Sequence, residues 1–205
     1  MNYAKNTIEW ADLKFFWLRR IVQTMLFKQF GKSHTSRWAN ANNLFESWDT
    51  RTKMLASFIP PNSTVLEFGA GRMMLRHYLP EGCQYTPSDI VDRGQNTLVC
   101  DLNAAHLPPF PFHDVIVFGG VLEYVHDLQR LIAHVATSCE MIVASYAVAD
   151  LPDQSTTISR RRHGWVNDWN SQALQALFLQ NGFACEEMMV WEMQHLFKFV
   201  MRRSR

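Results

Sequence analysis

The sequence predicts an α/β protein with a mostly parallel sheet, and three observations lead to this fold class. Short β-branched or apolar runs alternate with helical patterns from Thr64 onward, which is typical of parallel strand-helix-strand units. The first run stops at a glycine-rich turn, Gly69-Ala70-Gly71. The chain then ends on two strand-like runs, residues 183–190 and 195–201, with no helix between them. The final two strands are therefore expected to be antiparallel.

Composition limits the classes of protein and partner. A chain of 205 residues with 47% hydrophobic and 19% charged residues suits one compact globular domain. The formal net charge of +1 lacks the basic excess of nucleic-acid-binding proteins, so we expect no nucleic acid partner. Four separated cysteines without a C-x-x-C pair predict neither a disulfide framework nor a metal site. With no export signal or long apolar stretch, we expect a cytoplasmic protein.

The N-terminal part, residues 1–60, is predicted to be a helical cap on a domain formed by residues 61–205. From Ile8 to about Phe30, apolar residues recur every three or four positions, which predicts a helix ending at Gly31. The apolar residues at this spacing are Ile8, Ala11, Phe15, Leu18, Val22 and Met25. Our first interpretation is that this helix covers the core or the active site. The alternatives are a homodimer contact and peripheral contact with a membrane.

A second helical pattern, Leu44–Phe58, precedes Pro60-Pro61 and follows the polar and irregular residues 32–43. The run Val65–Phe68 then predicts a buried strand that contains Glu67 and leads into Gly69 and Gly71. These glycines allow a tight turn and close approach of a ligand to the backbone.

The glycine loop narrows the class of cofactor. A dinucleotide fingerprint requires a third glycine three residues after the second, and Met74 occupies that position. A hydride-transfer cofactor is therefore disfavoured. Glu67 lies two residues before Gly69, where an acid suits a cationic ligand better than a phosphate.

Two further acids follow predicted strands. The strand Gln84–Ser88 ends at Asp89, twenty residues after Gly69, where a carboxylate can accept hydrogen bonds from both hydroxyls of a ribose. The strand Thr97–Cys100 is followed by Asp101. Three acids at or near strand ends predict one ligand site at that edge of the sheet.

The rest of the chain continues the alternation. The strongest buried-strand pattern, Asp114–Phe118, runs into the segment Gly119–Asp127, which reads GGVLEYVHD. The segment Asp150–Asp168 is long and polar, and we predict that it forms a structured loop over a substrate without an element of its own. The other predicted elements are a helix at Leu128–Thr137, a strand at Met141–Tyr146 and a helix at Asn170–Leu179.

These motifs resemble those of the class I S-adenosylmethionine-dependent methyltransferases over about two-thirds of the chain. The loop EFGAG matches the family's E/D-x-G-x-G motif, and GGVLEYVHD matches its segment after the fourth strand, with Tyr124 in place of a usual histidine. The resemblance implies a Rossmann-like, seven-stranded sheet. It also implies S-adenosylmethionine as cofactor, S-adenosylhomocysteine as product, and no metal.

The resemblance assigns cofactor contacts to four groups of residues. They are Glu67, Gly69, Ala70 and Gly71, then Asp89 and Ile90, then Asp101, Leu102 and Asn103, and finally Gly119, Gly120, Val121 and Tyr124. The phrases YTPSD, CDLN and RRRHGWVN resemble methyltransferases of bacterial surface-glycan biosynthesis.

The acceptor is predicted to be a sugar or another small hydroxylated molecule, including a surface-glycan or carrier-linked one, that is methylated on oxygen. An alcohol must lose a proton, so the candidate catalytic groups are His163, His126 and Asp150, with Asp168 as a further base or orienting group. The predicted acceptor ligands are Arg160, Arg161 and Arg162, which suit a phosphate or carboxylate, together with Trp165 and Asn167. The alternatives are an N-methyltransferase acting on a small amine and a non-catalytic scaffold that binds a partner.

Overall fold

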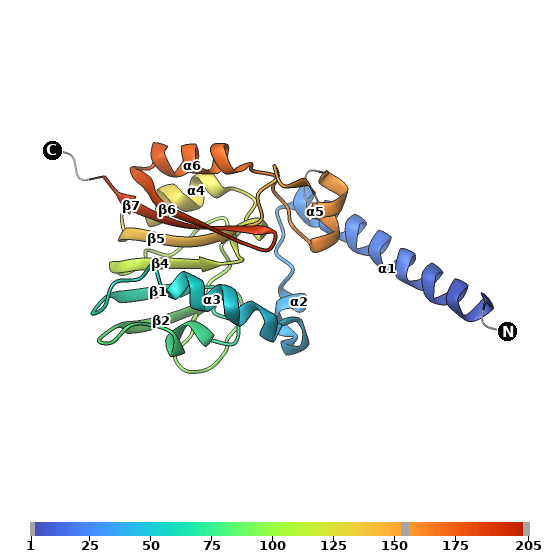
Figure 1. Ribbon diagram of the computed structural model, residues 1–205, viewed down its shortest axis with the longest axis horizontal. Coiled ribbons are helices and arrows are strands. Elements are labelled where there is room, and N and C mark those ends of the chain that lie inside the picture. Colours follow the sequence, from blue (N-terminus) through green and yellow to red (C-terminus); the bar gives the residue numbers. More distant parts are fainter. Residues whose placement is uncertain (1–2, 153–155, 203–205) are drawn as a thin grey trace.

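The computed structural model describes residues 3–152 and 156–202, with side chains from Lys14 onward. Its centre is a seven-stranded sheet in the order β3-β2-β1-β4-β5-β7-β6 (Figure 1). The first five strands in the chain are parallel, and β7 is antiparallel to both β5 and β6. This arrangement confirms the predicted fold class. The strands are β1 (Thr64–Phe68), β2 (Gln84–Asp89), β3 (Leu98–Val99), β4 (His113–Gly119), β5 (Cys139–Tyr146), β6 (Phe183–Trp191) and β7 (Gln194–Met201).

Helices cover both faces of the sheet and bury two apolar clusters. On one face, α4 and α6 pack with residues such as Ile132 and Phe178 against Phe118 and Phe199. On the other face, α3 contributes Leu55 to a cluster around the inner strands (Figure 1). The α-helices are α1 (Tyr3–Phe30), α2 (Thr35–Ala39), α3 (Asp49–Ala56), α4 (Leu128–Val135), α5 (Thr157–His163) and α6 (Ser171–Gln180).

The structure corrects several predicted elements. The long segment Asp150–Asp168 contains its own helix, α5, whose N-cap Thr156 accepts a hydrogen bond from the backbone N–H of Ser159. The pattern at 44–58 gives a 3-10 turn at Glu46–Trp48 followed by the shorter α3. After the glycine loop, the sequence pattern at Arg72–Tyr78 predicts a short helix, but the structure has only a 3-10 turn there, Met74–His77. Further 3-10 turns lie at Ala41–Asn43 and Leu122–Tyr124.

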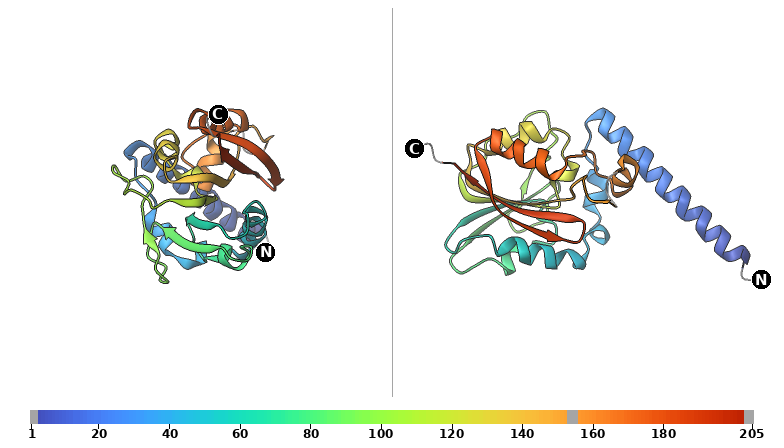
Figure 2. Two further views of the ribbon diagram at one scale, coloured as in Figure 1. Left: turned by 90° about the vertical axis from the view of Figure 1, so that its left-hand side faces the viewer. Right: turned by 45° about the horizontal axis from the view of Figure 1, so that its top comes forward.

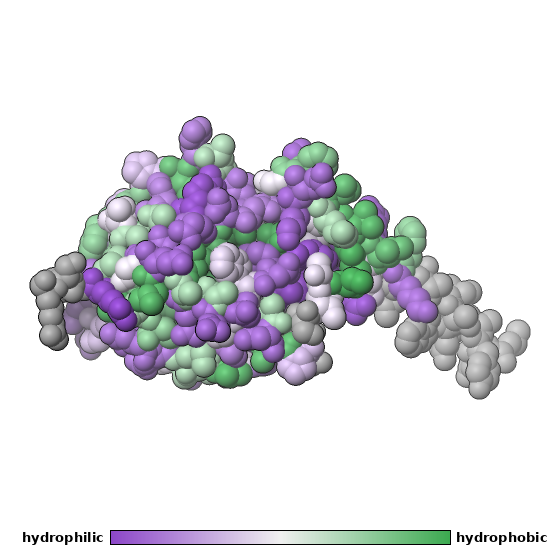
Figure 3. All heavy atoms as spheres, turned by 90° about the horizontal axis from the view of Figure 1, so that it is seen from above, coloured by the Kyte–Doolittle hydropathy of each residue, from purple (hydrophilic) through white to green (hydrophobic). Residues whose placement is uncertain are grey.

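The N-terminal segment crosses the carboxyl ends of the strands, and α1 then extends well beyond the body of the molecule (Figures 1 and 2). The inner part of α1 packs on α5, where the Thr24 hydroxyl donates a hydrogen bond of 3.0 Å to the Arg161 carbonyl. Hydrophobic side chains gather on the part of α1 that leaves the body (Figure 3). Within the described residues, no helix has the length and apolar character needed to cross a membrane.

Candidate functional site

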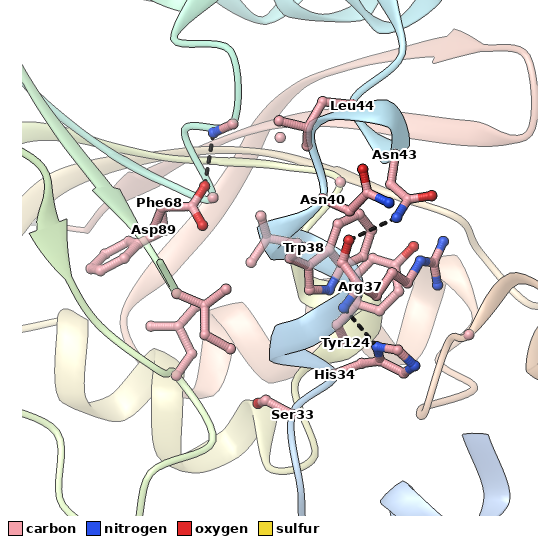
Figure 4. Close-up of a pocket in the computed structure, with 18 of the residues that line it drawn as sticks. Ser33, His34, Arg37, Trp38, Asn40, Asn43, Leu44, Phe68, Asp89 and Tyr124 are labelled. Carbon is pink, nitrogen blue, oxygen red and sulfur yellow. Dashed lines mark hydrogen bonds between the residues drawn. The ribbon is translucent and has the colours of Figure 1, made fainter. Parts of the chain in front are cut away.

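A cavity of about 540 Å³ lies between the carboxyl ends of the parallel strands and the N-terminal segment. Figure 4 shows the two sides, with Asp89 and Phe68 facing the segment that carries His34, Arg37 and Trp38. All thirteen residues predicted to contact the cofactor line this cavity. The structure therefore brings together residues that the sequence spreads from Glu67 to Tyr124.

The glycine loop after β1 fits closely against the loop after β4. Gly69 has a φ of +70°, and a Cβ there would lie 2.3 Å from Cγ2 of Val121. Such a contact is far below a normal van der Waals separation. Gly71 also has a positive φ, of +50°. The loop therefore needs glycine at Gly69 for both backbone conformation and space.

Asp89 ties the glycine loop to the end of β2. Its carboxylate accepts a hydrogen bond of 2.9 Å from the backbone N–H of Gly71 (Figure 4). Arg93, from the loop that follows β2, places its Nε 3.2 Å from the same oxygen. The carboxylate is 5% exposed, and the hydrogen bond from Gly71 and the ion pair with Arg93 hold it in a fixed position at the cavity wall.

Glu67 is a buried acid at the cavity wall. Its carboxyl group accepts a hydrogen bond from the Tyr85 hydroxyl. Burial raises the pKa of Glu67 to about 8, against the opposing effects of this hydrogen bond and of the charge on Arg51. Glu67 therefore holds a proton near neutral pH until a cation approaches it.

Asp101 joins the N-terminal segment to the sheet. Its carboxylate accepts a hydrogen bond of 2.6 Å from the Ser33 hydroxyl. The side-chain amide of Asn103 donates to Ser33 at 2.8 Å and to the Tyr124 carbonyl at 2.9 Å. Ser33 thus fastens the covering segment to two residues predicted to contact the cofactor.

A buried polar network centred on Arg51 lies behind the cavity, and it was not predicted from the sequence. In the sequence, Arg51 has the pattern of an ordinary surface charge. Arg51 donates to the Gly119 carbonyl at 3.0 Å and to the Gln194 side chain at 3.2 Å. Gln194 in turn donates to Glu123 at 3.1 Å. A Cβ on Gly120 would lie 2.4 Å from the Arg51 guanidinium, so a glycine is required there. The network supports the loop after β4, and only its tertiary contacts reveal it.

The structure gives two of the three predicted acceptor arginines internal partners. Arg160 is 1% exposed and donates to the Ala147 carbonyl at 2.7 Å, and Arg161 is 2% exposed and donates to the Trp165 carbonyl at 2.6 Å. Both also form ion pairs with Asp168. These contacts satisfy the guanidiniums inside the protein, so a role in binding an acceptor oxyanion does not fit them.

The other three predicted acceptor ligands also lie outside the cavity lining. Asn167 is buried and donates to the carbonyls of Leu122 and Val125 at 2.7 and 2.8 Å. Trp165 is buried, and Arg162 is exposed, with its guanidinium 5.4 Å from the ring centre of Trp17. The 150–168 segment reaches the cavity through Gly164 and Val166 instead.

None of the predicted bases lines the cavity. The ring of His163 stacks on Trp165 with centroids 4.5 Å apart, and its pKa is lowered by burial and by nearby arginines. His126 contacts the Lys32 carbonyl at 3.2 Å. Asp150 is exposed and accepts from the backbone N–H of Ser171 at the start of α6. Within the described part of the chain, no three metal-ligating side chains converge.

The comparisons with known proteins identify the family. A family described as a methyltransferase domain matches residues 40–188. The chain belongs to this family. This match confirms the resemblance seen in the sequence, and the predicted cofactor agrees with it. No curated protein has significant sequence similarity to the chain.

Several solved structures share the fold. They include the mitomycin 7-O-methyltransferase, with a TM-score of 0.66 at 13% identity, covering 92% of this chain and 68% of that one. The 1,6-didemethyltoxoflavin-N1-methyltransferase of Burkholderia thailandensis, solved with bound 1,6-didemethyltoxoflavin and S-adenosylhomocysteine, has a TM-score of 0.60 at 15% identity, covering 77% of this chain and 80% of that one. CalO1, a methyltransferase in calicheamicin biosynthesis, in its S-adenosylhomocysteine-bound form, has a TM-score of 0.58 at 15% identity, covering 75% of this chain. This chain spans about half, 54%, of CalO1.

Proposed function

We propose that the chain transfers a methyl group from S-adenosylmethionine to a small hydroxylated acceptor in the described cavity. One observation carries the proposal: all thirteen residues that the sequence assigns to the cofactor line a single cavity. The match to a methyltransferase family supports the same reaction class.

The residues present fit this cofactor. The buried carboxyl of Glu67 suits the amino group, and the loop at Gly69 packs directly on Val121 because it carries no Cβ. Asp89 would hold the ribose hydroxyls, and Asp101 and Leu102 would border the adenine. When bound, S-adenosylmethionine supplies an electrophilic methyl group.

The protein's own contribution is alignment and the exclusion of water. Ser33 holds the N-terminal segment over the sheet through Asp101, and the Arg51 network supports the loop that carries Gly119 and Gly120. In an in-line displacement, fixing the two reactants in position supplies much of the rate enhancement. His163 and His126 lie outside the cavity lining, so we do not propose either of them as the catalytic base.

We propose a sugar or another hydroxylated small molecule, glycan- or carrier-linked, as the acceptor. Gln23, Asn40 and Asn43 line the cavity with amide groups that suit hydroxyls. A second candidate is a small amine, since a neutral amine needs no base to attack and no predicted base lines the cavity. Transfer from labelled S-adenosylmethionine to panels of sugar nucleotides and of amines tests both. Methylated amines with unreactive sugars would favour the second candidate.

We further propose that α1 pairs with a second copy of the chain. Phe15, Leu18, Val22 and Met25 follow one another at spacings of three and four, as in the seam of a coiled coil, and all four are exposed, Phe15 by 70%. Ile8 and Ala11, which extend this spacing in the sequence, lie outside the described side chains. The exposed stripe faces away from the α1 side that packs on α5.

A further inference from the structure

Three arginines of the N-terminal segment line the cavity without an acidic partner. Arg19, Arg20 and Arg37 take part in no ion pair among the described residues. The other two arginines of the lining are paired. Arg72 lies 3.0 Å from Asp49, and Arg93 lies 3.2 Å from Asp89.

The part of the N-terminal segment that carries the three arginines contributes only basic charges to the cavity lining. Between residues 16 and 45, the charged lining residues are Arg19, Arg20, Lys32 and Arg37. Burial lowers the pKa of Arg20, and the positive charge of Arg37 lowers it further. The two guanidinium groups therefore lie close enough to repel each other. Burial lowers the pKa of His34, and the charges of Arg37 and Arg20 lower it further.

Arg37 is held in position by its surroundings. Its guanidinium lies 4.4 Å from the ring centre of Trp38 and 5.6 Å from that of Tyr124. Its Nη1 donates to the His163 carbonyl at 3.0 Å, which leaves four of its five N–H groups without a described partner. A Cβ on Gly164 would lie 2.3 Å from Nη1, so the glycine makes room for this guanidinium.

His34 adds a further donor to the same wall. Its Nδ1 accepts a hydrogen bond of 3.1 Å from the backbone N–H of Arg37 (Figure 4). Because Nδ1 uses its lone pair in this bond, the neutral ring carries its hydrogen on Nε2. The three arginines and this Nε2–H therefore all offer hydrogen-bond donors to the cavity. Phe16 and Phe27 lie beside them in the lining and offer apolar contact.

We propose that Arg20 and Arg37, with Arg19 at the rim, bind a carboxylate or phosphate group of the methyl acceptor. Like charges placed together in a half-buried wall favour a bound anion, and guanidinium groups match such oxyanions with paired hydrogen bonds. The inference rests on the proposed function, since it names the class of acceptor for that site. It moves the oxyanion site from Arg160–Arg162, as the sequence suggested, to the covering segment.

Calorimetric titrations with three probes of similar shape test this inference. Phenyl phosphate, benzoate and the neutral benzyl alcohol are titrated into the full chain, with and without S-adenosylhomocysteine. The variants are Arg20→Gln, Arg37→Gln and, as a control with the same loss of charge, Arg202→Gln, which changes an exposed residue outside the cavity. Thermal melting checks that each variant is folded. If Arg37→Gln does not fold, Arg37→Lys takes its place.

We expect at least one anion to bind more tightly than benzyl alcohol, and Arg20→Gln and Arg37→Gln each to weaken it about tenfold. Arg202→Gln should leave this affinity unchanged. The tighter of the two anions identifies phosphate or carboxylate. Equal affinity for all three probes, or an equal loss in Arg202→Gln, would overturn the inference. Failure of S-adenosylhomocysteine to bind would contradict the proposed function instead. The two failures can be distinguished because the probes are also titrated in the absence of S-adenosylhomocysteine.

Discussion

At the scale of single residues, Gly69 and Gly94 allow backbone conformation to be separated from close packing. Both have a positive φ, of +70° and +73°, but a Cβ at Gly69 would meet Val121 whereas Gly94 has nothing within 4 Å. We expect Gly69→Ala to weaken S-adenosylhomocysteine binding at least about tenfold, because the loop must shift away from Val121. Gly94→Ala should carry only the backbone cost. Calorimetry and thermal melting measure both effects, and similar losses in the two variants would contradict this account of Gly69.

Glu67 gives the cofactor site a pH dependence. Its pKa is raised to about 8 by burial, so the free protein holds this carboxyl protonated at neutral pH. A bound ammonium group favours the carboxylate, so affinity for S-adenosylhomocysteine should rise as the pH is raised towards about 8 and level off above it. Binding at pH 7 should also release a proton, which titrations in buffers of different ionisation enthalpy detect.

Glu67→Gln is the control for this prediction, because it keeps the shape of the side chain without its titration. We expect weaker binding in this variant, without proton release. Proton release that persists in Glu67→Gln would assign the titration to another group.

At the scale of elements, the charge run of α5 separates a buried arginine from an exposed one. Arg160 is 1% exposed and bonds to Ala147, Asn167 and Asp168, whereas Arg162 is exposed. Arg160→Met should lower the free energy of unfolding by about 3–5 kcal/mol, since buried carbonyls and a carboxylate lose their donor. Arg162→Met should lower it by about 0.5–1 kcal/mol, the value of a surface cation–π contact. Urea denaturation measures both, and equal losses would show that Arg160 is not an internal anchor.

The stripe on α1 predicts self-association. A charge placed in the seam by Leu18→Glu should convert a dimer to a monomer, because the apolar contact would have to bury a carboxylate. The matched control is Leu179→Glu, which changes an exposed leucine on α6, and it should leave the dimer intact. Sedimentation velocity measures the mass. A monomeric native chain would contradict the pairing, and binding to anionic vesicles by that monomer would identify a membrane as the occupant.

At the scale of the whole molecule, the sequence predicts the sheet side of the cavity better than its covering side. Glu67, Gly69 and Asp89 follow strands whose patterns are local, and parallel strands bring their carboxyl ends to one edge of the sheet. Arg20 and Arg37 meet only because α1 and α2 fold over that edge, which no local pattern encodes. The domain division at residue 60 remains a prediction.

The arginines of α5 also show that a local sequence pattern does not reveal tertiary partners. Three consecutive arginines are typical of a surface, but Arg160 and Arg161 find Asp168 seven or eight residues later and the Ala147 carbonyl at the end of β5. A prediction from sequence can detect the charges but not these partners. The same hydrogen bonds hold α5 in place within the segment Asp150–Asp168, for which the sequence predicts no helix or strand.

Titration of the native chain with S-adenosylhomocysteine, with Asp89→Ala as the matched variant, is the most direct test of the cofactor site. We expect saturable binding by the native chain and a loss of affinity of about tenfold or more in the variant, which lacks the carboxylate proposed to hold the ribose hydroxyls. No binding by the native chain at millimolar concentration would contradict the cofactor site.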